Sequence, residues 1–255
     1  MWNTLFPRKQ IKTGTTVHWA FDHQRHGVPT VSGLALLSFP PEPALTHYYG
    51  KNSSQFMKCP AFKSALQNTY VIKSPIDVEI VYDRREPTRK VMNVIVPEKA
   101  TPALREYLIH PRFRESQGEN AHEAFTLQTT PYLFWSDGDV AMEMIQPYLE
   151  WDNPNGVRVI SGHYNIGKWS RHIEYAVELQ QPTGTFKLRR GDVMFYVRFS
   201  TADPHTRLTL KESPITPEKR QEILENTQLK FSQSKCPLKA LYDLRAAFDQ
   251  RQRQG

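Results

Sequence analysis

Cysteine is scarce in this sequence. Only Cys59 and Cys236 occur among its 255 residues, and they lie far apart along the chain. A disulfide framework or a zinc site built from cysteines needs more of them, so both are excluded. Two free thiols are typical of a reducing compartment. Because no activating base stands beside Cys59 in the sequence, we expect a buried structural cysteine there rather than a nucleophile.

Long apolar runs are missing as well. No window approaches the roughly 18 apolar residues that a membrane-spanning helix requires. Residues 1–9 lack the apolar core, followed by small residues, of a secretory signal. We therefore expect a protein that is not secreted and that has no transmembrane segment.

The common catalytic and nucleotide-binding motifs do not occur either. The sequence holds no G-x-x-x-x-G-K-[ST], no G-x-G-x-x-G, no G-x-S-x-G and no H-E-x-x-H. The usual signatures of phosphate binding, dinucleotide binding, serine hydrolysis and zinc proteolysis are thus absent. Asp137-Gly138-Asp139 lacks the later acidic ligands of an EF-hand, and it predicts a tight turn between strands.

The charge balance is mildly basic. Lysine and arginine number 33 against 26 acidic residues, which gives a net charge of +7. That balance is compatible with nucleic acid or an acidic partner, but many proteins with the same balance bind neither. The basic pairs, which fall mostly at predicted turns, are Arg84-Arg85, Arg89-Lys90 and Arg189-Arg190. A nucleic-acid-binding module is therefore one alternative, and clustering of these side chains would favour it.

The clearest positive pattern runs from residue 160 to 199. Large apolar residues alternate with polar or small ones over 173–179, and the alternation resumes over 193–199 after a turn at 190–192. Such a period of two predicts a half-buried antiparallel sheet. The predicted buried face consists of Ile173, Tyr175, Val177, Leu179, Val193, Phe195, Val197 and Phe199.

Further short strands are predicted at 15–21, 70–72, 76–82, 125–129, 132–136, 140–149, 157–160 and 207–210. A charged turn at 83–87 leads from the strand at 76–82 into a partner strand that ends near residue 96, and the two form a hairpin. Short helices are expected at 60–66 and 101–108. Hydrophobic residues make up 39% of the chain, enough for a sizeable core. We expect a mainly β fold, an antiparallel β-sandwich or jelly-roll-like domain over residues 1–214.

The last forty residues have a different character. Thr216-Pro217-Glu218 is a good helix start, because threonine caps and proline fits the first turn. Apolar residues then recur at helical spacing up to Phe248. Residues 215–255 are thus predicted to form a helical appendage that docks on the sheets, on a sister subunit or on another protein.

Two sets of histidines invite a metal interpretation. His172-Ile173-Glu174 followed by His205 is similar to the His-x-carboxylate and distal histidine of cupins and 2-oxoglutarate oxygenases, which hold iron or another metal on a jelly roll. The pattern departs from these families, because glutamate replaces aspartate and the distal histidine comes early. His172 and Glu174 also fall on the polar face of the predicted strand, which favours a solvated pair over a metal site.

The second set lies near the start of the chain. His18, His23 and His26 are predicted to be surface or hydrogen-bonding histidines, because no further convergent ligand is evident. We thus expect no cofactor, with iron or zinc at His172, Glu174 and His205 as the alternative.

Four short segments together resemble a known family: Lys58 to Phe62, Asn68 to Asp77, Lys168 to Arg171 and Gly191 to Phe199. The family consists of uncharacterised proteins of tailed bacteriophages, notably marine ones, and is known only as a domain of unknown function. The resemblance covers roughly residues 56–210. It implies a phage or bacterial origin, and a place in the host cytoplasm or the virion, but no activity and no functional residues.

The leading interpretation is a non-enzymatic phage protein that is virion-associated or acts through protein contacts. Residues 216–255 are the expected contact segment, for a partner protein or for self-association. A metal-dependent jelly-roll enzyme and a nucleic-acid-binding module are the alternatives.

Overall fold

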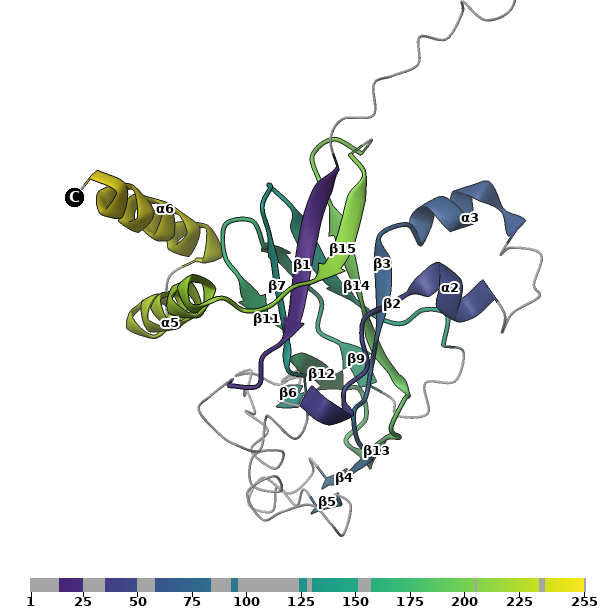
Figure 1. The fold of residues 1–255 in the computed structure, drawn as a ribbon. Coiled ribbons are helices and arrows are strands. Elements are labelled where there is room, and N and C mark those ends of the chain that lie inside the picture. Colours follow the sequence, from purple (N-terminus) through teal and green to yellow (C-terminus); the bar gives the residue numbers. More distant parts are fainter. Residues whose placement is uncertain are drawn as a thin grey trace, which may run out of the picture.

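The computed structural model describes residues 14–24, 35–49, 58–83, 93–95, 124–127, 130–150, 157–204, 206–233 and 237–254. Strands dominate this part of the chain, and two helices follow them at its C-terminal end (Figure 1). The mainly β class with antiparallel sheets and a C-terminal helical segment is therefore confirmed, while the jelly-roll connectivity stays a prediction. The predicted helix at 101–108 lies outside the described residues.

Two larger sheets form the body of the molecule. The first has the order β11 (Arg171–His172), β7 (Tyr132–Ser136), β1 (Thr15–Phe21), β15 (Leu208–Glu212). The second has the order β10 (Gly162–Asn165), β8 (Ala141–Ile145), β14 (Val193–Ser200), β3 (Thr69–Lys73), β2 (Glu42–Pro43). Their pairings are antiparallel except that of β1 with β15, which is parallel.

Two smaller sheets complete the β structure. One has the order β6 (Ala124–Leu127), β12 (Tyr175–Leu179), β9 (Val157–Val159), and the other β13 (Thr183–Leu188), β4 (Val78–Asp83), β5 (Asn93–Ile95). The antiparallel pairing of β4 with β5 confirms the hairpin that the charged turn predicts.

The main core lies between the sheets and contains the predicted apolar faces. Alternate residues of β1, β7 and β14 point into it, so a period of two in the sequence becomes one buried face for each strand. Among the largest of these side chains are Trp19, Tyr132, Phe134, Tyr175, Phe186, Phe195 and Phe199.

Helices cover the outer faces of both larger sheets. On the second sheet, Tyr196 of β14 packs with Tyr48 of α2 (Ala44–Tyr49). On the first, Leu133 and Trp135 of β7 pack with Ile223 of α5 (Pro217–Ser232). The half-buried prediction is therefore wrong for β14, whose residues from Met194 to Val197 are all buried, because a helix takes the place of solvent.

The stretch 160–199 also differs from a single sheet. Its predicted inward residues are buried, except Val193, which is only half-buried. Yet β12, β13 and β14 belong to three different sheets, and each pairs with strands from elsewhere in the chain. Alternation reports which residues face the core, but a strand's partner depends on contacts between distant segments.

Helix α5 begins as its sequence predicts. The hydroxyl of Thr216 accepts a hydrogen bond from the backbone N–H of Lys219, and Pro217 occupies the first turn of α5. Helix α6 (Leu238–Gln254) follows, and both helices lie on the opposite side of the sheets from α2 and α3 (Pro60–Ala65) in Figure 1.

Two further findings bear on the sequence predictions. Cys59, expected to be buried, is exposed, because it precedes the short helix α3, none of whose residues is buried. In the portion of the chain that is described, every helix is too short or too polar to span a bilayer.

Candidate binding cleft

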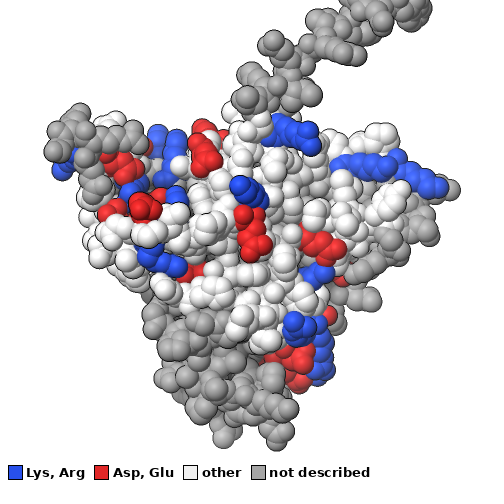
Figure 2. Space-filling view, in the orientation of Figure 1, with Lys and Arg blue, Asp and Glu red and all other residues white. Residues whose placement is uncertain are grey.

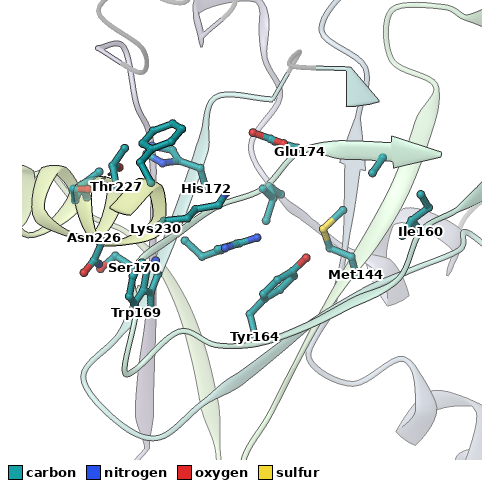
Figure 3. Close-up of a pocket in the computed structure, with 15 residues that line it drawn as sticks. Met144, Ile160, Tyr164, Trp169, Ser170, His172, Glu174, Asn226, Thr227 and Lys230 are labelled. Carbon is teal, nitrogen blue, oxygen red and sulfur yellow. Dashed lines mark hydrogen bonds between the residues drawn. The ribbon is translucent and has the colours of Figure 1, made fainter. Parts of the chain in front are cut away.

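A cleft of about 230 Å³ opens between helix α5 and the neighbouring sheet edges (Figure 3). Asn226, Thr227 and Lys230 of α5 form one side, and Met144, Ile160 and Tyr164 lie across from them. Its other walls come from the segment 169–176, which includes β11 and the first residues of β12. Phe231, in the last turns of α5, also lines it.

Asp22 fixes the helical wall of the cleft. Its side chain is fully buried just after β1, where both carboxylate oxygens accept hydrogen bonds from Arg220 Nη1 at 2.7 and 2.8 Å. His172 Nε2 lies 2.7 Å from Asp22 Oδ2, and the backbone N–H of Gln24 donates to Oδ1. One carboxylate thus joins α5, β11 and the end of β1.

The protonation state of Asp22 follows from these contacts. Burial acts to raise its pKa, because a charged carboxylate is costly away from water. The hydrogen bonds and charges of His172 and Arg220, with the backbone N–H of Gln24, outweigh burial and hold the pKa well below its usual range. Asp22 is therefore ionised at neutral pH, and it accepts the Nε2–H of His172.

The residues of the predicted metal site are only partly brought together. His172 ends β11 and Glu174 precedes β12, so the two do not sit on one continuous strand as predicted. Both are half-buried beside α5, in the wall of the cleft. His205 falls outside the described residues, and those residues hold no group of three histidine, cysteine or acidic side chains suited to a metal. The iron or zinc site stays a prediction, and metal analysis of the purified protein tests it.

Arg171 gives the cleft a positioned positive charge. Its guanidinium lies over the ring of Tyr164, with 4.2 Å between Cζ and the ring centroid. Among the described residues it forms no ion pair with a carboxylate. A guanidinium can bind a planar carboxylate with two parallel hydrogen bonds.

Asn226 supplies unused hydrogen-bonding capacity at the same place. It is only 3% exposed, and neither Oδ1 nor Nδ2 has a hydrogen-bond partner in the described part of the chain. Leaving a buried polar group unsatisfied costs about 1–3 kcal/mol. Asn226 comes three residues after the buried Ile223, so helical spacing places both side chains on the face of α5 that packs against the sheets. This spacing is visible in the sequence, but the sequence predictions did not include it.

A second constellation, also missed, has the residue types of a serine hydrolase. His18 Nδ1 lies 2.8 Å from Ser213 Oγ, and His18 Nε2 lies 2.8 Å from Asp137 Oδ2. Asp137, however, is 74% exposed, so solvent competes for its carboxylate. The backbone N–H of Ser213 donates to the Trp19 carbonyl and is not turned to an oxyanion. The arrangement ties β1 to the segment after β15, and the prediction of a hydrogen-bonding histidine is confirmed for His18.

The basic residues do not form a continuous patch on the face drawn in Figure 2. Lysine and arginine appear there as separate groups, several of them next to acidic residues. Several basic residues are also paired with acidic ones, as in Lys73–Glu42 and Arg245–Glu225. Arg84-Arg85 and Arg89-Lys90 lie outside the described residues. The nucleic-acid alternative remains a prediction, which salt-sensitive retention on DNA or RNA tests.

The two C-terminal helices expose large apolar side chains. We call these the helical surface, and it consists of Leu224, Phe231, Leu244 and Phe248. Leu224 and Phe231 are seven residues apart on α5 and share one side of it, and Leu244 and Phe248, four apart, share one side of α6. Phe231 is 68% exposed.

Comparison with known proteins adds no assignment. The chain matches no family model and no curated protein.

Proposed function

We propose that this chain is a non-enzymatic phage protein that acts through protein contacts, and that the helical surface makes them. The observation that carries the proposal is the exposure of Leu224, Phe231, Leu244 and Phe248 on the helices that follow the sheets. Clusters of large exposed apolar residues mark interaction sites when they are presented together on a firm support.

The support under the helical surface is built from specific polar contacts. Arg220 binds the buried Asp22, and the hydroxyl of Ser170 donates to Glu222 of α5. On α6, the Tyr242 hydroxyl accepts from the backbone N–H of Asn165, and Leu241 is buried. Arg245 of α6 also pairs with a glutamate of α5 at 2.7 Å. These contacts hold the helices to the sheets while their apolar side chains stay exposed, and a rigid platform reduces the entropy cost of binding.

The phage part of the proposal comes from the resemblance over residues 56–210. A phage protein that binds other proteins works either in the assembled particle or in the host cytoplasm. Within these two settings we favour the virion, because a preformed apolar platform suits a lasting contact better than a transient one.

Mass spectrometry of purified phage particles tests the virion version. We expect the chain to remain with the particles through density-gradient purification and to be lost when Leu224, Leu244 and Phe248 are all changed to serine. A matched variant with Tyr49 and Tyr148 changed to serine alters two exposed aromatic residues elsewhere and should be retained. Particles that never contain the chain would remove the virion version.

A further inference from the structure

The cleft beside α5 has the features of a second binding site, which shares Phe231 with the helical surface. We propose that it binds an organic monocarboxylate, an acid whose single carboxylate is attached to an aromatic or branched aliphatic body. The carboxylate lies on Arg171, and the body lies among the apolar walls.

The net charge of the side chains that line the cleft favours a ligand with a single negative charge. Arg171 and Lys230 are positive at neutral pH and Glu174 is negative, so the lining carries one net positive charge. His172 is occupied with the buried Asp22. A monoanion balances this lining, whereas a phosphate dianion leaves an uncompensated charge close to Glu174.

The geometry of Arg171 selects the carboxylate itself. Contact with the Tyr164 ring positions the guanidinium before any ligand arrives. A carboxylate matches the planar guanidinium with two charge-assisted hydrogen bonds, which are stronger than bonds between neutral groups. No described residue supplies a carboxylate partner for Arg171, so within the described part of the chain this donor is available to a ligand.

The remaining walls select the body of the ligand. Met144, Ile160 and Phe231 offer apolar contact around the charged groups, as in most small-molecule sites. The cleft is smaller than the 300–1,000 Å³ usual for drug-sized ligands. Asn226 is a buried part of the same lining, and a rotation of its side chain would give the ligand a hydrogen bond that no described residue supplies.

A single carboxylate on an apolar body occurs in two kinds of ligand, a free organic acid and the C-terminal residue of a polypeptide. Isothermal titration of the full chain separates them with four probes: 3-phenylpropionate, 3-phenylpropanamide, phenyl phosphate, and a tripeptide ending in phenylalanine. We expect saturable binding of a carboxylate probe with a Kd below about 1 mM. We expect the amide to bind about tenfold more weakly or worse, because it loses the charge-assisted bonds.

Variants locate the binding. Arg171→Gln and Lys230→Gln should each weaken binding of the carboxylate, Arg171→Gln by about tenfold or more. Lys63→Gln removes a positive charge from an exposed position of α3, on the other side of the sheets from α5 in Figure 1, and should leave the Kd within about twofold. If Arg171→Gln does not fold, Lys230→Gln on the surface of α5 carries the test.

Tighter binding of the tripeptide identifies a polypeptide C-terminus as the source, and tighter binding of 3-phenylpropionate identifies a free acid; both support the monocarboxylate site. No saturable binding of either carboxylate overturns it, as does an amide that binds as well as the acid. Tighter binding of phenyl phosphate, or a Kd unchanged in both cleft variants, overturns it too.

Discussion

Arg220 in the first turn of helix α5 donates to both carboxylate oxygens of Asp22, a fully buried residue 198 positions earlier in the chain. The contact joins the C-terminal helical segment to the sheets, and through His172 it also reaches the wall of the cleft. The proposed contact surface and the proposed carboxylate site both depend on this ion pair, because it sets where α5 lies.

Replacing Asp22 tests the stabilising effect of this ion pair. Asp22→Asn keeps the shape but removes the charge that Arg220 and His172 contact, and breaking a buried ion pair costs about 3–5 kcal/mol. We expect a loss of about 3 kcal/mol in the free energy of unfolding, measured by urea denaturation. Asp137→Asn is the matched control, because Asp137 also pairs with a histidine but is exposed, and it should cost less than about 0.5 kcal/mol. Equal losses in the two variants would contradict the account.

The same residue gives a pH dependence of known sign. The pKa of Asp22 is depressed in the folded state, so its contribution is fully present above its unfolded pKa of about 3.8 and is lost as the pH falls. The difference in unfolding free energy between wild type and Asp22→Asn should therefore shrink as the pH falls from 5 to 3. Taking this difference removes the contributions of the other carboxylates, which the two proteins share. A difference that grows on acidification would have the wrong sign.

The buried amide of Asn226 is predicted to lower the free energy of unfolding of the ligand-free protein. Asn226→Leu keeps roughly the same volume and removes two buried polar atoms that have no partner among the described residues, so the free energy of unfolding should rise by about 1 kcal/mol. Asn165→Leu is the matched substitution at a satisfied asparagine, whose oxygen accepts from the backbone N–H groups of Gly167 and Lys168. That variant should lose about 1–2 kcal/mol. Chemical denaturation of both variants gives the comparison, and a destabilised Asn226→Leu would show that the amide has a partner.

The start of α5 offers a smaller, local test. Thr216→Ala removes the side-chain oxygen that accepts from the Lys219 N–H and should cost about 1 kcal/mol. Thr216→Ser keeps that oxygen and should stay within about 0.5 kcal/mol of wild type. Denaturant unfolding measures both, and equal effects would mean that the cap does not stabilise the helix.

Local patterns in the sequence predict the strands and helices well. Strand β1 and the start of α5 at Pro217 depend on neighbouring residues, through alternation and capping, so they can be read directly. The parallel pairing of Thr15 with Leu208 cannot be predicted in this way, because it depends on contacts between the two ends of the described chain. The exposure of Cys59 has the same kind of cause, since the environment of a short helix is set by its neighbours in space.

The candidate site was predictable only in fragments. His172 and Glu174 stand out in the sequence, but their position at the cleft requires α5 to cover that side of the sheets. Asp22 and Arg220 give no sequence signal, because neither lies near the other until the fold brings them together. Asn226 is the exception, since a polar residue on the docking face of a helix can be found from the helical period alone.

Site-specific photo-cross-linking tests the proposed contact surface most directly. A benzophenone amino acid is placed at Leu224 or Leu244 on the helical surface, or at Tyr49 on α2, which is exposed on the other side of the molecule. After irradiation of infected cells, the account predicts a discrete adduct from Leu224 and Leu244 and none from Tyr49. The mass of the adduct shows whether the partner is a second copy or another protein. Absence of adducts from both helical positions, or the same adducts from Tyr49, would contradict the claim that the helical surface makes the contact.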